Sequence, residues 1–182
     1  MDVNALQMAL TQGDWARAEA LLSPLAQRPD AHVSILYNFG KVLLELGRFR
    51  DASAALTRAV ETTPDHANAW FELGRASLAD SDFEQALEAF GAAARLMPED
   101  PDCWRNLGRV ALRLGKYEIA QTAWQRFPGD PEAALALYRV AAETGAAEAS
   151  EMRQALLQHH PDRAQVIKTL VRVARGSIPL DL

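Results

Sequence analysis

Basic side chains recur along this sequence at an interval of 34 residues, as Lys41, Arg75 and Arg109. Around the last of these, Arg105, Arg109 and Arg113 stand four residues apart, which places them on one face if the segment is helical. A guanidinium group offers a planar pair of donors to carboxylate or phosphate oxygens. Cations gathered on one surface would therefore suit an acidic segment, a C-terminal carboxylate or a phosphate group. The alternative is a solvated face on which the arginines pair with carboxylates, the candidates being Glu45, Glu72 and Asp102.

The same interval governs the apolar and small residues around these cations. One copy consists of Trp70, Gly74, Ala86 and Phe90. The next has Trp104, Gly108, Ala120 and Trp124, and the preceding one has Leu36, Gly40, Ala52 and Leu56. A fourth copy near the N-terminus has Gly13, Trp15, Ala18 and Leu22 in the matching second half. Repeats of this length, each with two helix-sized apolar segments, predict an array of stacked helical hairpins.

Small residues and prolines have predictable places in such hairpins. A glycine inside a helix costs about 1 kcal/mol relative to alanine, so we expect close approach of a partner helix at Gly40, Gly74 and Gly108. Left-handed turn positions are expected at Gly13, Gly47, Ser81 and Gly115. Pro64 and Pro98 are expected to end second helices. The recurring aromatic residues are then mainly packing residues.

The recurring residues resemble the tetratricopeptide repeat (TPR) pattern. It occurs here as Trp70-x2-Leu73-Gly74-x2-Ser77, then Ala86-x3-Phe90, then Pro98. The likeness is strong over residues 1 to 128, and it suggests a bacterial TPR scaffold or recruitment domain. It implies an all-α fold, a right-handed α-solenoid of stacked antiparallel helix pairs with about five hairpins and a C-terminal capping helix. We expect a single domain over 1–175, with units at about 1–32, 33–66, 67–100, 101–130 and 131–161, a cap at 162–175, and 176–182 as a tail or the start of a further region.

The pattern changes after Trp124. Pro128 arrives about four residues early, which predicts a shortened second helix in the fourth unit. A divergent helix pair follows, and Arg139 continues the cation series if that pair begins at Pro131. The segment DRAQVIKTLVRVARG has an apolar side and a basic side. It is typical of an amphipathic end cap, and binding to a membrane surface is the alternative.

The resemblance also implies where a ligand would lie, because first helices of TPR arrays line a concave, partner-binding groove. The groove positions that we select as candidate peptide-binding residues are Tyr37, Asn38, Lys41, Phe71, Glu72, Arg75, Arg105, Asn106, Arg109 and Arg113. In some family members asparagines at these positions hold backbone amides of the peptide, for which an amide side chain is suited. The lysine and asparagine arrangement of chaperone-binding members is absent.

Composition narrows the function classes. The chain has 182 residues and a net charge of −5, which argues against general nucleic-acid binding. Its N-terminus has neither a basic start nor a long apolar run, so we expect no secretory signal, no membrane span and a cytoplasmic location. The single cysteine, Cys103, is expected to be a packing residue, and neither a metal nor a cofactor is expected. The sequence contains no HExxH motif, no phosphate-binding glycine loop and no nucleophile elbow.

We therefore expect a non-catalytic scaffold for a protein or peptide partner, bound in the groove through an acidic or carboxylate-bearing part. The alternative is the N-terminal, substrate-recruiting part of a longer enzyme, such as a glycosyl-, sulfo- or methyltransferase. Self-association through the ends of the array is a third hypothesis.

Overall fold

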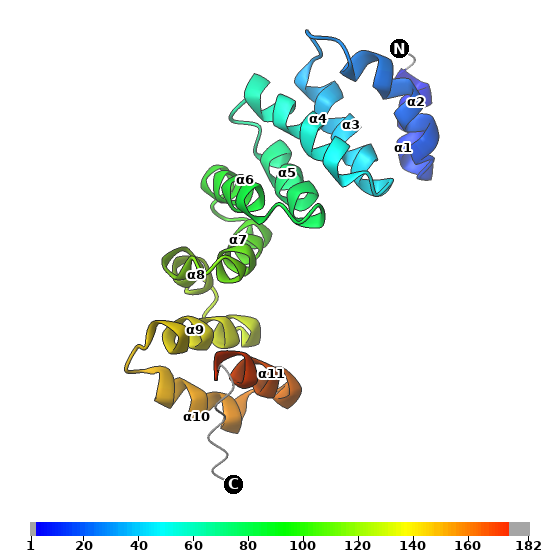
Figure 1. Ribbon diagram of the computed structural model, residues 1–182. Helices are drawn as coiled ribbons and strands as arrows, with labels where there is room; N and C mark the ends of the chain where they lie inside the picture. Colours follow the sequence, from blue (N-terminus) through cyan, green and yellow to red (C-terminus); the bar gives the residue numbers. More distant parts are fainter. Residues whose placement is uncertain (1–2, 175–182) are drawn as a thin grey trace. The chain divides into compact units, whose positions relative to one another are not determined.

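The structure, a computed structural model, describes residues 3–174 as eleven helices joined by short loops, with no strand in that range (Figure 1). The helices are α1 (Val3–Gln12), α2 (Trp15–Ala26), α3 (Val33–Glu45), α4 (Phe49–Thr62), α5 (Ala67–Ala79), α6 (Phe83–Leu96), α7 (Pro101–Arg113), α8 (Tyr117–Trp124), α9 (Pro131–Thr144), α10 (Ala149–His159) and α11 (Arg163–Val173). None of the helices in the described range has the length and apolarity needed to cross a bilayer.

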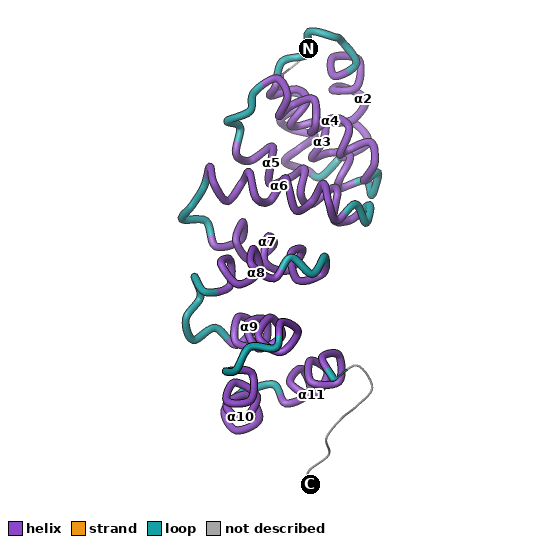
Figure 2. Tube along the Cα trace, turned by 60° about the vertical axis from the view of Figure 1, so that its left-hand side comes forward, coloured by secondary structure: helices purple, strands orange, loops and turns teal. Residues whose placement is uncertain are grey.

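The chain divides into two compact units, Met1–Asn106 (unit 1) and Leu107–Leu182 (unit 2), with the boundary inside α7. In unit 1, α1 packs on α2, α3 on α4 and α5 on α6, while α2 also contacts α3 and α4 contacts α5. In unit 2, α9 contacts α8, α10 and α11. The regular alternation of helix and loop is clear in Figure 2.

The predicted fold class, an all-α solenoid of stacked antiparallel helix pairs, is confirmed by this pairing. The predicted single domain over residues 1–175 and its unit boundaries remain predictions. Residues 176–182, expected to be a tail or the start of a further region, lie outside the described residues.

Glycines bring the two helices of each hairpin close together, as predicted. A Cβ atom built on Gly40 would lie 2.5 Å from Leu56 Cγ, and one on Gly74 would lie 2.7 Å from the Phe90 ring. At Gly108 the corresponding distance, to Trp124 Nε1, is 2.5 Å. Any side chain at these positions would collide with its neighbour. The close contact that glycine allows therefore offsets the cost of glycine inside a helix.

The turns between paired helices also follow the sequence pattern. Gly13, Gly47 and Gly115 have φ values of 68°, 73° and 67°, and Ser81 occupies the same conformation at 66°. A left-handed backbone costs a non-glycine residue roughly 1 kcal/mol or more, so Ser81 is the strained member of the series.

The residue that caps the start of a first helix recurs at the repeat interval of 34 residues. His32 Nδ1 accepts a hydrogen bond from the Ser34 amide at 3.2 Å, and His66 Nδ1 accepts one from the Ala69 amide at 3.1 Å. Asp100 Oδ1 accepts from the Asp102 amide at 2.9 Å. The cap of α9 is Asp130, four residues before the interval would place it. The shift follows the predicted shortening, because α8 has 8 residues where α6 has 14.

The two units bury different kinds of core. Unit 1 buries mainly small and aliphatic side chains, and Leu36, Leu56 and Phe90 have at most 1% of their surface exposed. The C-terminal helices of unit 2 share a smaller cluster built around Tyr138, Leu156 and Val166. Val166 is the one fully buried residue that α11 contributes within the described range.

Candidate functional site

The candidate residues on α3 contact their own helix and the start of α5. Lys41 is exposed, and its Nζ lies 5.3 Å from the centroid of the Tyr37 ring, one turn away. The Tyr37 ring also lies 4.9 Å from the ring of His66. Asn38 donates its side-chain amide to the carbonyl of Ser34 at 2.7 Å. The Tyr37 ring is partly buried against the core, whereas Lys41 is exposed. A cation–π contact at the surface contributes only about 0.5–1 kcal/mol, so the Lys41 charge stays accessible to a ligand.

On α5 the predicted cation is compensated by a neighbouring carboxylate. Arg75 donates to Glu72 Oε2 at 2.7 Å, and the Glu72 residue is only 8% exposed. Arg75 therefore forms an ion pair with Glu72. This is the pairing that the sequence offered as the alternative to a cation available for a ligand. Phe71 contacts Phe90 edge to face, with ring centroids 5.7 Å apart, which commits part of its surface to the core.

The four candidates on α7 fall in both units. Arg105, which is partly buried, and Asn106 lie in unit 1, whereas Arg109 and Arg113 lie in unit 2. Asn106 donates its side-chain amide to the carbonyl of Asp102 at 2.9 Å, as Asn38 does to Ser34. In both residues one amide hydrogen is thus already bonded to the preceding helical turn.

Two further cations of the series are paired inside unit 2. Arg109 forms a bidentate ion pair with Glu132 at 2.6 and 2.7 Å. Arg139 donates to Glu143 at 2.6 Å and to the Leu112 carbonyl at 3.0 Å. Glu143 also accepts a hydrogen bond from the hydroxyl of Tyr117. Neither carboxylate was predicted as a partner, because these contacts join different helices or lie beyond the regular repeats.

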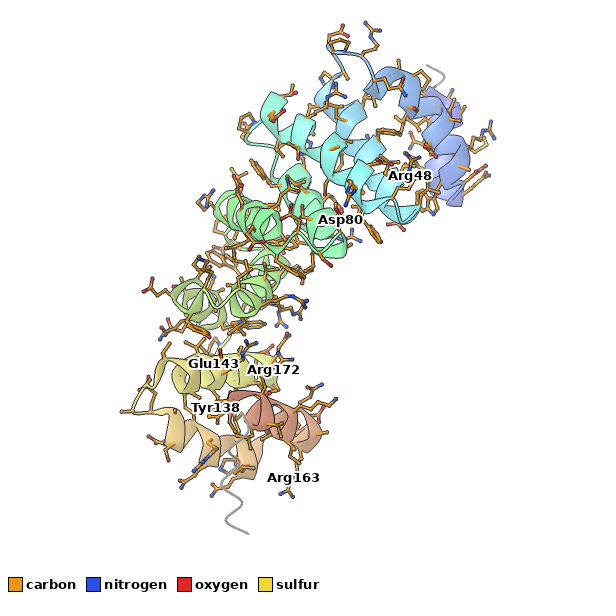
Figure 3. All side chains as sticks on the ribbon, in the orientation of Figure 1. Arg48, Asp80, Tyr138, Glu143, Arg163 and Arg172 are labelled. Carbon is orange, nitrogen blue, oxygen red and sulfur yellow. The ribbon has the colours of Figure 1, made fainter. Side chains whose placement is uncertain are left out.

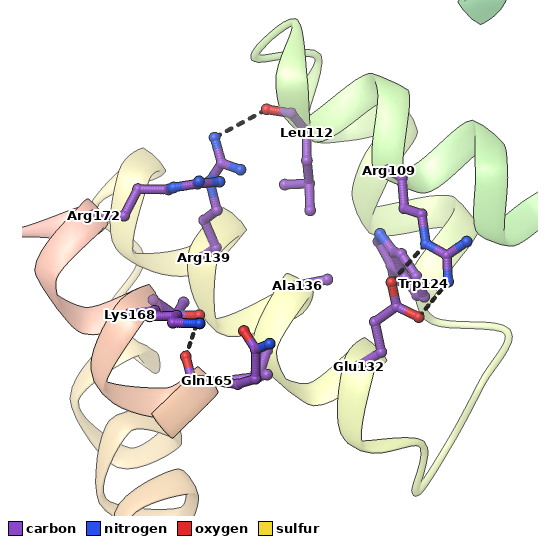
Figure 4. Close-up of a pocket in the computed structure, with 11 residues that line it drawn as sticks. Arg109, Leu112, Trp124, Glu132, Ala136, Arg139, Gln165, Lys168 and Arg172 are labelled. Atoms are coloured by element: carbon purple, nitrogen blue, oxygen red, sulfur yellow. Dashed lines mark hydrogen bonds and ion pairs between the residues drawn. The ribbon is translucent and has the colours of Figure 1, made fainter. Parts of the chain in front are cut away.

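Unit 2 contains a pocket of about 310 Å³ that combines these pairs with residues of the last helix (Figure 4). Its apolar lining comes from Leu112, Trp124, Leu135 and Ala136. Its charged lining, shared by α7, α9 and α11, consists of Arg109, Glu132, Arg139, Lys168 and Arg172. We call this hollow the cationic pocket, since four of its five charged residues are basic.

Lys168 and Arg172 differ from the other two cations of the cationic pocket. Among residues 3–174, neither has a carboxylate oxygen within the 4.0 Å of an ion pair. They lie four residues apart on α11, where two like charges repel each other. From the sequence they were interpreted as the basic side of an amphipathic end cap, with binding to a membrane surface as the alternative. The signal that could have drawn attention to them is the spacing that marked Arg105, Arg109 and Arg113.

Two buried titratable side chains take no part in these charged surfaces. Burial raises the pKa of the Cys103 thiol in unit 1 to about 11, and Asp100 and Asp102 add to the shift. In unit 2, burial raises the pKa of the Tyr138 hydroxyl, with Arg153 opposing the shift. A thiol with so high a pKa is a poor nucleophile, which agrees with the packing role expected of Cys103. In the described part of the chain no three His, Cys, Asp or Glu side chains gather as metal ligands would.

Comparison with known families identifies the class of protein to which this fold belongs. A model of the tetratricopeptide repeat matches residues 37–102 and 78–150, which together make up more than half of the chain. The chain is therefore a member of the tetratricopeptide repeat family. A comparison with curated proteins finds no match.

Solved structures agree with the family assignment. A crystal structure of MamA is 21% identical, over 96% of this chain and 98% of that one, with a TM-score of 0.71. A tetratricopeptide repeat protein from Parabacteroides merdae is 15% identical, over 95% and 71% of the two chains, with a TM-score of 0.72. PilF of Pseudomonas aeruginosa is 18% identical, over 92% and 78%, with a TM-score of 0.63. At these identities the likeness is one of fold.

Proposed function

We propose that this protein is a non-catalytic scaffold that binds an acidic segment of a partner protein. A general role in protein interaction follows from the tetratricopeptide fold. The observation that carries the finer proposal is the cationic pocket, which places four basic side chains and one carboxylate around one hollow in a chain whose net charge is −5. Such a local excess of positive charge attracts anionic groups and orients them.

Charge alone does not supply the affinity. An exposed ion pair contributes about 0.2–1 kcal/mol, whereas a micromolar complex requires about 8 kcal/mol. The remainder must come from apolar and backbone contacts, for which the pocket offers Leu112, Leu135 and Ala136. We therefore expect modest affinity that falls as salt concentration rises.

We also propose contacts in unit 1 for acidic ligands. Lys41 and the half-exposed Arg75 are the proposed partners of acidic side chains, and Tyr37 and Phe71 would add apolar contact. The free amide atoms of Asn38 and Asn106 are suited to backbone groups of a peptide. Glu72 has a different proposed role, since it lies almost buried beside Arg75 and positions that cation.

Fluorescence anisotropy with labelled peptides tests the proposal. The probe is a peptide of alternating glutamate and leucine, and its control has glutamine in place of every glutamate. We expect the acidic peptide alone to bind, and to bind more weakly when salt is raised from about 50 to about 300 mM, since screening strengthens over that range. Equal binding of both peptides, or of neither, would contradict the proposal.

Two pairs of substitutions locate the contact. Lys41→Gln with Arg75→Gln probes unit 1, and Arg109→Gln with Lys168→Gln probes unit 2. The matched control, Arg50→Gln with Arg163→Gln, removes the same charge from exposed positions that do not line the cationic pocket. The proposal expects at least one test pair to weaken binding more than the control pair does. Equal loss in all three would mean that only net charge matters.

A further inference from the structure

We propose that α11 binds the surface of an anionic lipid bilayer, with Ile167 and Val171 entering the headgroup region and the basic side chains of the helix contacting lipid phosphates. This interaction surface goes beyond the function proposed above, because neither apolar residue lines the cationic pocket. The sequence offered membrane binding as the alternative to an end cap. The exposure of these two residues in the structure is the observation that now favours it.

The apolar side chains of α11 divide into a buried group and an exposed group. Val166 is 1% exposed, and Leu170 and Val173 pack against the core cluster to which it belongs. Ile167 and Val171, by contrast, are 56% and 49% exposed. Single exposed apolar residues are common on protein surfaces, but these two lie one turn apart on the same face of a helix. A helix that only closed the end of unit 2 would need the buried group alone.

Basic side chains adjoin the exposed pair. Arg163, Ile167 and Val171 follow one another at intervals of four residues, so they form one row along α11. Lys168 and Arg172 form the next row around the helix, one residue further along the chain. The exposed apolar surface of α11 is therefore bordered by positive charge at one end and along one side.

The charge of these three basic residues is not compensated within the described part of the chain. All three are exposed, and none has a carboxylate oxygen within the 4.0 Å of an ion pair among residues 3–174. The helix itself contains no acidic residue. Asp162 precedes it and caps it, accepting a hydrogen bond from the Gln165 amide at 3.0 Å. Figure 3 shows Arg163 and Arg172 at opposite ends of α11, so the positive charge extends along the whole helix.

An anionic lipid surface fits this pattern better than a second copy of the protein does. Two α11 helices that paired through their exposed rows would bring basic side chains together, and neither helix has a carboxylate to offset the repulsion. A partner helix normally lies in an apolar groove, whereas Ile167 and Val171 stand on the outside of one helix. A helix that lies in the membrane surface has exposed apolar residues with Lys or Arg beside them, and each basic residue adds attraction to anionic lipids.

Vesicle flotation of the full chain tests the proposal. One set of vesicles contains equal parts of phosphatidylglycerol and phosphatidylcholine, and the other contains phosphatidylcholine alone. We expect binding to the anionic vesicles only, and weaker binding when salt is raised from about 50 to about 300 mM. Since the chain has a net charge of −5, its overall charge opposes this result, and attraction must come from a local surface. Equal binding to both kinds of vesicle, or to neither, would overturn the proposal.

Substitutions that avoid the cationic pocket test the assignment to α11. Ile167→Ser with Val171→Ser should weaken binding to anionic vesicles about tenfold, because two half-exposed apolar side chains no longer enter the bilayer. Arg163→Gln should weaken it about fivefold, the effect of one basic residue near an anionic surface. The matched control, Val3→Ser with Met8→Ser, removes two exposed apolar side chains from α1. Circular dichroism verifies that the variants are folded.

Each outcome decides for or against the lipid surface. If the α1 control loses as much binding as the α11 pair, or if the α11 pair keeps wild-type binding, the proposal is wrong. Analytical ultracentrifugation without lipid covers the other occupant, since a wild-type dimer that the α11 pair abolishes would assign the exposed row to a second copy. None of the substituted residues lines the cationic pocket, so acidic-peptide binding should be unchanged in every variant. Vesicle binding and peptide binding can therefore fail independently.

Discussion

Lys41 and Arg75 of unit 1 and Arg109 of unit 2 occupy the same position of the repeat, yet they stand in different surroundings. In unit 1, Lys41 lies beside an aromatic ring of its own helix, and Arg75 pairs with Glu72 of its own helix. In unit 2, Arg109 pairs with a carboxylate on another helix, and it lines a hollow together with Lys168 and Arg172, which have no ion-pair partner among residues 3–174. The difference shows that a row of basic residues in the sequence does not measure available charge. How much positive charge a ligand can use depends on the carboxylates and rings that surround each cation in the fold.

The units also differ in packing, and this contrast gives the largest expected effect. Phe90→Ala in unit 1 should lower the free energy of unfolding by about 3–5 kcal/mol, because Phe90 is fully buried. Val166→Ala in unit 2 removes two carbons from a smaller cluster and should cost about 2 kcal/mol. Urea unfolding of each variant measures both. A greater loss for the valine variant would reverse the comparison of the two cores.

The buried thiol of Cys103 in unit 1 also predicts a pH dependence of stability. Burial raises the pKa of the Cys103 thiol to about 11, so the folded state favours the neutral thiol. Its contribution to stability is fully present below about pH 9 and is lost as pH rises towards 11, by the order of 2 kcal/mol. The measurement is urea unfolding at several pH values for the wild type and for Cys103→Ala. Parallel curves for the two proteins would show that Cys103 does not contribute.

The glycine contacts are where the two units are alike. Gly74→Ala and Gly108→Ala should each cost about 1–3 kcal/mol, since the added carbon meets Phe90 or Trp124 at less than 3 Å. The control is Gly74→Ala in a Phe90→Ala background, where the collision is absent and alanine favours the helix. A cost that persisted in that background would show that contact with Phe90 is not the reason for glycine.

The smallest expected effect concerns the ion pair at the edge of the cationic pocket. Glu132→Gln should release Arg109 and tighten binding of an acidic peptide about two- to fivefold, the scale of an exposed ion pair. Glu72→Gln is the matched change in unit 1 and should leave binding at the cationic pocket unchanged. Weaker binding after Glu132→Gln would mean that the pair holds Arg109 in the position that the ligand needs.

The sequence predicted those features that depend on local spacing. The helix pairs, the close contact at Gly40, Gly74 and Gly108, and the left-handed turn at Ser81 all follow from residues that recur every 34 positions. The interval even indicated that α8 would be short. Each of these features is decided by a few residues close together in the chain or by one repeated contact.

The cationic pocket could not be predicted in the same way. Arg109 and Glu132 are 23 residues apart and lie on different helices, beyond the point where the repeat interval is lost. Without the interval, nothing in the sequence says which residues of α9 and α11 face one another. Lys168 and Arg172 therefore resembled the polar side of any amphipathic helix. Their place in a shared hollow depends on tertiary packing.

The residue opposite each hairpin glycine becomes larger along the chain, from Leu56 to Phe90 to Trp124. Since the glycine contributes no side chain, it can remain unchanged while its partner varies from an aliphatic to a two-ring aromatic residue. A repeat copied by gene duplication can thus diverge at this contact by a single substitution, without a second change in the facing helix. The contact that holds each hairpin together is in this way also a site where repeats can drift apart independently.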